Sequence, residues 1–140
     1  MNHDSNCLFC KIVAGDLPSS KVAEDDLTLA FMDINPWTKG HTLVISKEHA
    51  ATFFELSEAA AIAVMRTAHK IAPTVKDAVG AEGMNLFQSN GRAAWQQVDH
   101  YHLHLIPRWF KDTLVPPTTP TPGNPEEIRQ TAQKIKSALQ

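Results

Sequence analysis

The chain has 140 residues and a mass of 15.5 kDa, enough for one domain with a single core and too little for two. Hydrophobic residues make up 43% and charged residues 20%, a balance that excludes a disordered chain. The 13 basic residues are outnumbered by 15 acidic ones, and the formal charge of -2 argues against a nucleic-acid partner.

No apolar stretch approaches the roughly 20 residues that a membrane helix requires. The N-terminal residues also lack the basic region followed by an apolar run that is typical of a secretory signal. We therefore expect a cytoplasmic protein that contacts no membrane. In that compartment the two cysteines, Cys7 and Cys10, are more typical of a metal or redox pair than of a disulfide.

Five short segments have the composition of β-strands. They are separated by turn-forming residues and cover 21–23, 27–33, 41–46, 84–88 and 100–106. The short connections between the first three favour an antiparallel meander. Because the strands are grouped around one long helix, the pattern predicts an α+β fold rather than an alternating α/β fold.

The long helix is expected between the third and fourth strands. Ser57 is a suitable N-cap for the alanine-rich run 58–79, and Gly80 is expected to end it. Pro73 is expected to kink the helix or to end it early. Residues at helical spacing predict its apolar side: Ile62, Met65, Ala68, His69 and Ala72.

The C-terminal region differs in composition from the rest. Five of the nine prolines fall between residues 114 and 125, which predicts an extended connector over 112–124. Asn124 and Pro125 are helix-start signals, so an amphipathic helix is expected within 125–140. Its apolar side consists of Ile128, Ala132, Ile135 and Leu139. The helix would pack on the domain or on a partner, and the segment would cover a binding site, extend a dimer contact or dock another protein.

The most informative stretch is 100–106, in which histidines alternate with apolar residues. Alternate side chains of a strand share one face, so His100, His102 and His104 would lie together. Tyr101, Leu103 and Leu105 would then enter the core from the other face. On a helix the same spacing would scatter the imidazoles by about 100° per residue.

Three gathered imidazoles have three possible uses. They could form a solvated face, although strict alternation makes that a poor explanation. They could bind a metal, but three in line extend over roughly 13 Å of strand, too far for one ion without a bend. They could carry out covalent or acid–base chemistry on a phosphate, because a neutral imidazole can attack while a neighbour donates a proton.

Amide-bearing residues close to this stretch favour the phosphate chemistry. Asn90 with Gly91, and Gln96 with Gln97, offer side-chain amides and backbone N–H groups that can hold phosphate oxygens without adding charge. Taken alone, Asn90 and Gly91 are more typical of a simple turn.

The sequence closely resembles the histidine triad (HIT) superfamily of nucleotide-binding hydrolases and transferases. The motif of that family is His-x-His-x-His-x-x with apolar x, and residues 100–106 match it throughout. The resemblance covers roughly residues 7–109. It includes further blocks in the expected order: 7–12, 24–26, 31–36, 40–45 and 47–49. The resemblance implies a HIT domain over 1–111 with a five-stranded antiparallel sheet, two helices and a homodimer that joins two sheets.

The resemblance also implies roles for the polar residues. His102 would be the nucleophile on the α-phosphate and form a nucleotidyl-histidine intermediate, while His104 would contact the phosphate and the leaving atom. His100 and His41 would orient the nucleophile. The positions expected to meet phosphate oxygens are Asn90, Gln96 and Gln97.

A nucleoside pocket follows from the same resemblance. Its expected residues are Leu8, Phe9, Ile12, Phe31, Asp33 and Ile34. Aromatic rings such as Phe9 and Phe31 can offer faces or edges to a flat base, although both are equally typical of a core. The Asp33 carboxylate suits the paired hydroxyls of a ribose.

Two positions depart from the family pattern. Trp95 stands where the family commonly has glycine, and Gln97 stands where several branches place serine or threonine. The first would change the path of the loop, and the second removes a hydroxyl that would contact phosphate. Both changes concern the preference for the leaving group more than the chemistry.

Zinc is the cofactor that the resemblance implies, and no organic cofactor is expected. In some bacterial members the two cysteines and two histidines bind the metal, and the matching residues are Cys7, Cys10, His49 and His100. Four N/S ligands leave no position for water, so this zinc would be structural. Two reduced cysteines without metal remain the alternative.

The activity implied is hydrolysis or transfer of nucleoside monophosphate groups from purine nucleotide conjugates, either phosphoramidates or dinucleoside polyphosphates. A second hypothesis is a nucleotide-binding scaffold or sensor with little turnover. A third is a zinc-dependent hydrolase in which the histidines are metal ligands.

Overall fold

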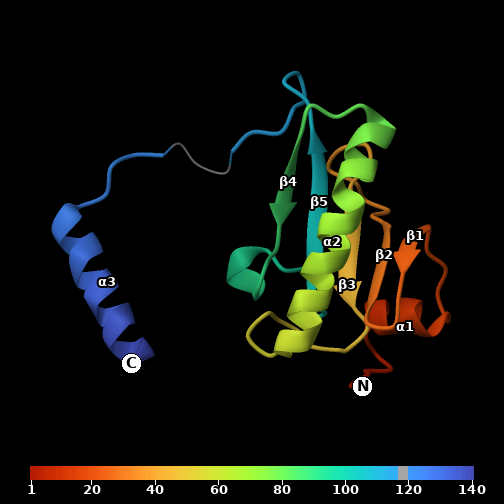
Figure 1. Cartoon of the computed structure of the whole chain (residues 1–140), viewed down its shortest axis with the longest axis horizontal. Coiled ribbons are helices and arrows are strands. Elements are labelled where there is room, and N and C mark those ends of the chain that lie inside the picture. The colour runs from red at the N-terminus through yellow and green to blue at the C-terminus, as the bar shows by residue number, and fades with distance from the viewer. Residues whose placement is uncertain (117–119) are drawn as a thin grey trace.

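The computed structural model describes residues 1–116 and 120–140, and one antiparallel sheet organises the fold (Figure 1). Its strands are β1 (Lys21–Glu24), β2 (Thr28–Met32), β3 (Thr42–Ser46), β4 (Gly83–Phe87) and β5 (His102–Arg108). The spatial order is β1-β2-β3-β5-β4, so the first three strands form the predicted meander and β5 lies between β3 and β4. The expected α+β class and five-stranded antiparallel sheet are confirmed.

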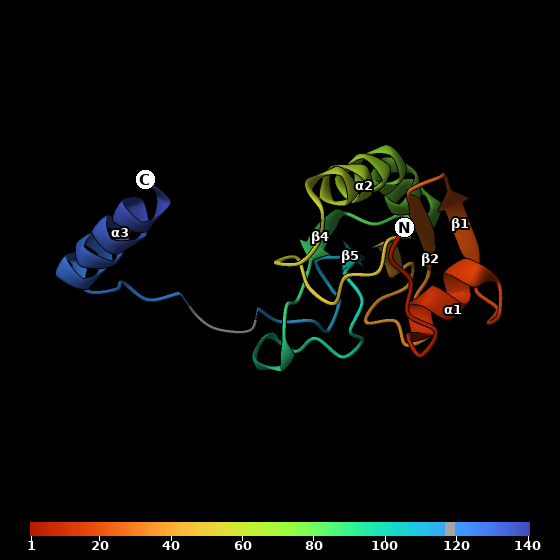
Figure 2. The same ribbon diagram turned by 90° about the horizontal axis from the view of Figure 1, so that it is seen from below.

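Two helices cover opposite faces of this sheet, as Figure 2 shows. The long helix α2 (Glu58–Val79) packs on one face, and the short helix α1 (Leu8–Ala14) packs on the other. Each face therefore has its own apolar cluster. The side chains of the strands alternate between the two clusters, as the pleat of a sheet requires.

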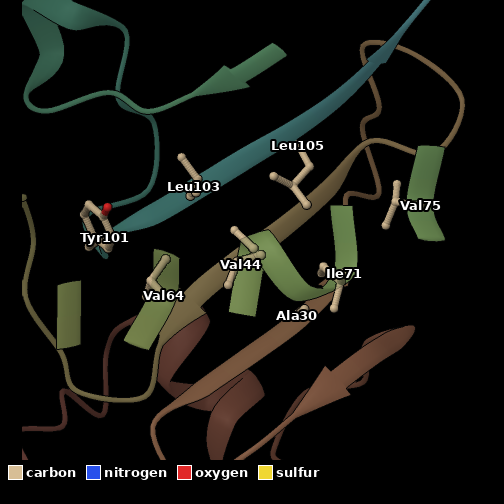
Figure 3. Close-up of a cluster of buried hydrophobic side chains, with 9 residues drawn as sticks. Ala30, Val44, Val64, Ile71, Val75, Tyr101, Leu103 and Leu105 are labelled. Atoms are coloured by element: carbon tan, nitrogen blue, oxygen red, sulfur yellow. The ribbon is translucent and has the colours of Figure 1, made fainter. Parts of the chain in front are cut away.

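The α2 face contains the cluster drawn in Figure 3. Strand residues Ala30, Val44 and Leu105 are fully buried there against Val64 and Ile71 of α2. Tyr101 and Leu103 also belong to this cluster, as the alternation around the histidines predicts. The histidines consequently belong to the α1 face.

Helix α2 has the predicted bounds, with Ser57 accepting a hydrogen bond from the backbone N–H of Ala60 and Gly80 in the left-handed conformation. The prediction that Pro73 ends the helix early is wrong, because α2 continues to Val79. The predicted apolar side is also wrong in part: Ile62, Met65 and His69 are exposed. The buried stripe consists of Ala60, Ala63, Val64, Thr67, Ala68, Ile71 and Val75.

Helix α1 is a local consequence of the Cys-x-x-Cys stretch. The Cys7 Sγ accepts the backbone N–H of Cys10 at 3.4 Å, and Gly15 ends the helix with a φ of 83°. Phe9, Cys10 and Ile12 are its buried residues. This helix places both thiols and an aromatic ring on the histidine face of the sheet.

Strand β5 begins two residues later than predicted. His100 lies in a bend before the strand, and the regular pairing with β3 starts at His102, which lies opposite Ile45. His104 lies opposite Leu43 on the same face. The bend matters because it removes the line of three imidazoles and lets His100 turn toward α1.

The C-terminal helix α3 (Pro125–Leu139) forms where it was predicted, and the Asn124 side chain caps the N–H groups of Glu126 and Glu127. Every residue of α3 is exposed, so the expected packing on the domain is not found. Figures 1 and 2 show α3 beyond the β4 edge of the sheet. The described parts of the connector, 112–116 and 120–124, contain no helix or strand, and the predicted connector residues 117–119 lie outside the described residues.

Within the described ranges, the helices are all too short or too polar to span a lipid bilayer.

Candidate active site and metal cluster

A cavity of about 640 Å³ opens on the α1 face of the sheet, and His102 and His104 lie in its floor. Its walls come from α1, from the segment that follows β2, and from the loop before β5. Most of the predicted site residues line it: Leu8, Phe9, Ile12, Phe31, Asp33, Ile34, Gln96, Gln97, His102 and His104. His41, His49, His100, Asn90 and the two cysteines are not part of its lining.

The imidazoles of the triad lie on one side of the sheet. The rings of His102 and His104 have centroids 4.8 Å apart. The Phe9 ring stands edge-on to His102 at 5.2 Å and to His100 at 5.9 Å, so all three histidines share the α1 side. His102 and His104 line the cavity, whereas His100 is fully buried behind it.

The tautomer of His102 follows from its hydrogen bond. Its Nδ1 lies 2.6 Å from the backbone carbonyl oxygen of His100, and a carbonyl can only accept, so Nδ1 carries the proton. The other nitrogen, Nε2, therefore has a free lone pair. An imidazole on the floor of a cavity with a bare nitrogen is chemically a nucleophile or a base.

A second chain of hydrogen bonds fixes the tautomers of His41 and His104. The backbone N–H of Trp37 donates to His41 Nδ1 at 3.0 Å, so the His41 proton is on Nε2. His41 Nε2 lies 2.8 Å from His104 Nδ1 and donates to it. His104 consequently carries its own proton on Nε2. The site thus pairs a bare nitrogen on His102 with an N–H donor on His104.

Burial keeps these imidazoles neutral near pH 7. Desolvation is the main cause that lowers the pKa of His102, of His41 and of His104, and the pKa of His104 falls to about 4. The neighbouring His102 and His41 lower the His104 pKa further, while Asp33 opposes the shift. A neutral His102 keeps the lone pair on Nε2, which protonation would remove.

Asp33 directly follows β2, lines the cavity and approaches the histidines. Its Oδ1 accepts the backbone N–H of Asn35 at 2.8 Å, and its Oδ2 lies 3.5 Å from His41 Nε2. The carboxylate is partly exposed to the cavity and has acceptor capacity left for a ligand.

The predicted phosphate-binding amides behave differently from one another. Gln96 is buried, donates to the carbonyls of Ala51 and Val98, and accepts the N–H of Gly91, so its amide braces the loop. The Asn90 side chain bonds to Gln88 and to the N–H of Phe53 outside the cavity. Gln97 lines the cavity and is exposed.

The α1 end of the cavity is apolar. Phe9 and Phe31 are buried and meet edge to face, with centroids 5.5 Å apart. Leu8 and Ile34 are exposed at the rim of the same region. Buried aromatic edges together with open aliphatic walls suit a flat heterocycle.

Sequence reasoning missed several lining residues. Trp37, Phe87 and Trp95 form an aromatic wall beside His104, and only the unusual Trp95 gave a signal in the sequence. Ser19 lines the cavity too, and its buried hydroxyl has no hydrogen-bond partner among the described residues. A lone serine outside the helices and strands carries no pattern by which it could have been found.

Behind the cavity, four residues distant in sequence bring their ligand atoms together: Cys7, Cys10, His49 and His100. The His100 Nδ1 lies 3.3 Å from Cys7 Sγ, 3.6 Å from Cys10 Sγ and 3.3 Å from His49 Nδ1. The Cys10 Sγ lies 3.4 Å from His49 Nδ1. In a tetrahedral zinc site with the usual bond lengths, ligand atoms are about 3.3–3.8 Å apart, so this cluster has the required size.

The tautomer of His100 also suits a metal. Its Nε2 lies 2.7 Å from the carbonyl oxygen of Ser46 and must donate to it, which leaves the Nδ1 lone pair directed at the thiols. Burial raises the pKa of the Cys10 thiol to about 11. A bound cation would displace that proton, because the thiolate is the form that ligates metal. The donor set and its spacing therefore fit zinc.

The fold and cavity together define a class of protein: an α+β domain that presents histidines from one central strand to a nucleotide-sized pocket. The HIT domain model matches residues 14–111, and the chain belongs to the HIT family.

Similar proteins cover nearly the whole chain. An adenosine 5'-monophosphoramidase of Schizosaccharomyces pombe is 44% identical over 96% of this chain and 98% of its own length. A crystal structure from Streptococcus mutans superposes with a TM-score of 0.94 at 40% identity, over 99% of this chain and 88% of that one. A zinc-bound histidine triad protein of Mycobacterium smegmatis has a TM-score of 0.74 at 33% identity, over 95% of this chain and 97% of that one.

Proposed function

We propose that the protein hydrolyses purine nucleotide conjugates at the α-phosphate through a covalent intermediate on His102. The family and the named relatives make it an enzyme, a nucleotide hydrolase of the HIT type. The observation that carries the finer proposal is the hydrogen bond from His102 Nδ1 to the carbonyl of His100, because it leaves a bare Nε2 on the cavity floor.

The first step is an in-line attack of His102 Nε2 on the α-phosphorus. A P–Nε2 bond forms while the bond from phosphorus to the leaving nitrogen or oxygen breaks. The leaving nitrogen takes up a proton from solvent and departs as a neutral amine rather than as an anion, while the neutral His104 Nε2–H donates a hydrogen bond to it. The nucleotidyl group is then attached to His102.

The second step returns the enzyme to its starting state. Water attacks the same phosphorus and releases a proton to solvent, and the P–Nε2 bond breaks, which returns the electron pair to His102 Nε2. The products are a nucleoside monophosphate and the released group. His41 holds His104 Nδ1 through a 2.8 Å hydrogen bond in both steps and so keeps the proton on the nitrogen that faces the cavity.

The nucleoside would occupy the α1 end of the cavity. We place the purine against Phe9, Phe31 and Ile12, and the ribose hydroxyls at the Asp33 carboxylate. The apolar character of that end supports this placement, as does the free acceptor capacity of Asp33. Gln97 would donate hydrogen bonds to phosphate oxygens directly. Gln96 and Asn90 would do so after giving up their present hydrogen bonds within the protein.

Zinc would be held by Cys7, Cys10, His49 and His100 and would be structural, because four protein ligands close the coordination sphere. It would join α1 to the bend before β5. The carbonyl that orients His102 belongs to this bend, so the cluster stabilises the nucleophile's tautomer from behind. Two free thiols in a ligand cluster also suit the reducing cytoplasm, which we propose as the location.

A homodimer is the assembly that we propose. Strand β4 is an edge of the sheet, and edge strands present unpaired backbone groups. Leu86 on this strand is half exposed. The C-terminal arm, of which residues 112–116 and 120–140 are described, continues past the same edge (Figure 1), and the match to the Streptococcus mutans structure over 99% of this chain includes the arm. A second copy paired at β4 would cover the arm's apolar side.

The test is rapid quenching of turnover with an adenosine 5'-phosphoramidate, followed by mass spectrometry of peptides. We expect an adenylylated peptide that contains His102. The His102→Ala variant should lose at least about a thousandfold in kcat and form no adduct. The His69→Ala variant, which removes an exposed histidine of α2, should match the parent. Turnover by His102→Ala at the parent rate would contradict the proposal, and tight AMP binding without turnover of any conjugate would indicate a sensor instead.

A further inference from the structure

We propose that a groove between helix α2 and strand β1 binds helix α3 of a second copy of this chain. This inference rests on the proposed homodimer and not on the proposed hydrolysis. The groove has a volume of about 330 Å³ and lies on the α2 face of the sheet. The cavity that contains His102 and His104 opens on the opposite face, so the two sites are separate.

The groove is apolar and has the length of a short helix. Ile71 and Val75 are buried in it, and Val22 of β1 is half exposed beside them. The residues that α2 contributes run from Lys70 to Val79. Nine residues of helix rise about 14 Å, so the apolar wall extends over two and a half helical turns. A concave surface of this kind suits the apolar side of an amphipathic helix.

Helix α3 has such an apolar side and lacks a cover for it. None of its 15 residues is buried, and Ile128, Ile135 and Leu139 are 60%, 55% and 82% exposed. A helix of this length is only marginally stable alone in water, and packing of its apolar side is what stabilises it. The apolar side rises about 17 Å from Ile128 to Leu139, which is close to the length of the groove.

The C-terminal arm extends away from the groove of its own chain. That groove includes Val22 of β1, one edge of the sheet, whereas the arm passes β4, the other edge (Figure 1). The Streptococcus mutans structure shares this position of the arm. Residues 112–140 are about a fifth of the chain, and a TM-score of 0.94 would not be reached with a fifth of the chain displaced. A second copy is therefore the source of a cover for α3.

Pairing of β4 with β4 of the second copy brings a groove within reach of the arm. Antiparallel pairing of identical strands creates a two-fold axis perpendicular to the joined sheet, so both α2 helices lie on one face. The groove of the second copy is then three to five strand spacings from β4, roughly 14–24 Å. Residues 115–124 are ten residues, which span at most about 36 Å. Figure 2 shows the C-terminal end of α3 level with α2, away from α1.

The direction of α3 agrees with the charges at the two ends of the groove. In Figure 1 α3 and α2 run in opposite directions, and the two-fold axis makes α3 parallel to α2 of the second copy. The acidic first turn of α3, with Glu126 and Glu127, then lies at the Lys70 end, and Lys136 lies near Asp77. The reverse direction would bring Lys136 to Lys70. Such exposed charges set the orientation more than the affinity.

Disulfide trapping tests this contact. Thr74→Cys places a thiol in the groove, and Ala132→Cys places one on the apolar side of α3, both at exposed positions. The two single variants are mixed, allowed to exchange subunits and oxidised with oxidised glutathione. A disulfide forms only when the Cα atoms approach within about 7 Å. We expect a covalent dimer that contains one chain of each variant, seen on a non-reducing gel and by mass spectrometry.

Ser137→Cys is the matched control, because Ser137 lies on the side of α3 opposite the apolar residues. Mixed with Thr74→Cys, it should give less than about a tenth of the covalent dimer. Equal yields would indicate random collision and overturn the inference. A disulfide within one chain of the double variant Thr74→Cys/Ala132→Cys would show that α3 returns to its own groove, which also overturns it. So would the absence of a disulfide in both arrangements.

A second measurement needs no added cysteine. Ala78→Glu places a charge in the groove and Ile135→Glu places one on the apolar side of α3, and both positions are exposed in the single chain. Each should raise the dissociation constant of the dimer by about tenfold, as measured by light scattering over a concentration series. The double variant should dissociate no more readily than either single one, because both changes remove the same contact. Ser137→Glu should match the parent, and fully additive effects would overturn the inference.

The outcomes also separate this inference from the other proposals. None of the substituted residues lines the catalytic cavity, so kcat/KM for an adenosine 5'-phosphoramidate should stay at the parent value. A parent dimer that gives no trapped product overturns the groove alone. A parent that is monomeric at every concentration overturns the proposed homodimer and this inference together. Failure of the parent to hydrolyse the phosphoramidate would overturn only the proposed hydrolysis.

Discussion

Two groups of metal-capable side chains lie on the same side of the sheet, yet hydrogen bonding gives them different chemistry. One consists of Cys7, Cys10, His49 and His100, and the other of Asp33, His41 and His104. In both groups the ligand atoms lie within 4.8 Å of one another. Proximity alone would make both of them metal sites.

The difference lies in where the lone pairs point. In the cysteine group, His100 uses its N–H on the Ser46 carbonyl, and its free lone pair faces the two thiols. In the aspartate group, the His41 lone pair accepts the Trp37 N–H, and the His41 proton is donated to His104. In the cysteine group the free lone pairs point toward a common centre. In the aspartate group the imidazole nitrogens of His41 and the Nδ1 of His104 are already engaged in hydrogen bonds. We therefore propose metal binding for the first group and hydrogen bonding to the substrate for the second.

The largest effect is expected when a metal ligand is removed from the cysteine group. We expect His49→Ala to reduce bound zinc from about one per chain to less than a tenth and to lower the Tm by about 10 °C or more. Metal analysis and calorimetry measure both effects. The exposed His69→Ala serves as the control and should retain zinc and Tm. Full zinc content in His49→Ala would remove the distinction between the groups.

The second test uses pH and the neutral state of His104. The His104 pKa of about 4 in the folded chain lies below the ordinary value near 6.5. Between these two pH values His104 is protonated in the unfolded chain and neutral in the folded chain. Stability is then lost as pH falls from about 6.5 toward 4, by about 3 kcal/mol from this group, and none is lost above the window.

Urea unfolding of the parent and of His104→Asn at pH 7 and pH 4.5 measures this contribution. The variant should show the shallower decrease, because asparagine does not titrate. His69→Asn is the control and should keep the parent's slope. Equal slopes in the parent and in His104→Asn would show that His104 is not held neutral by the fold.

A smaller effect is expected from Asp33→Asn, which keeps the size of the side chain and removes its charge. The loss of a charged acceptor for ribose hydroxyls should raise KM for an adenosine 5'-phosphoramidate by about tenfold. Zinc should stay at about one per chain, because Asp33 belongs to the other group. Asp16→Asn, on an exposed residue outside the cavity, is the control for kinetics and metal content. Zinc lost together with affinity would place metal in the aspartate group.

The smallest effect should follow from deleting residues 112–140. None of the described residues of this segment belongs to the cavity lining or to either group, so zinc content and kcat/KM should change less than about twofold. The dimer of the truncated chain should dissociate at a higher protein concentration than the parent dimer, as measured by light scattering over a concentration series. A large loss of kcat/KM would show that the arm covers the site of a second copy.

The elements that could be predicted from the sequence are those with local signals. The Ser57 and Gly80 caps gave the bounds of α2, and the Asn124 and Pro125 pair gave the start of α3. The buried side of α2 was mispredicted, because Ile62 and Met65 are apolar and half exposed while Ala60 and Ala63 are buried. Helical periodicity shows that a helix is amphipathic, but which small residues face a sheet depends on how closely the two elements approach.

The candidate site was predictable in the same uneven way. Alternation in 100–106 gathered His102 and His104 on one face, and the resemblance supplied His41 and His49. The bend at His100 was not foreseen, because it is stabilised by contacts far along the chain: the Ser46 carbonyl, the Ala50 carbonyl and the cysteines. Trp37 and Phe87 were not identified either, since nothing in their local sequence relates one to the other.

The sequence by itself determined the spacing of groups along a strand and along a helical turn: two histidines at a separation of two residues, and two thiols at a separation of three. Backbone geometry converts such spacings into a shared face without help from the rest of the chain. The tertiary structure alone decided which nitrogen of each imidazole is free, because the carbonyls and N–H groups that fix the tautomers come from other segments. It also decided that an aromatic wall stands beside His104, because strand register sets the distance between residues that the sequence keeps far apart.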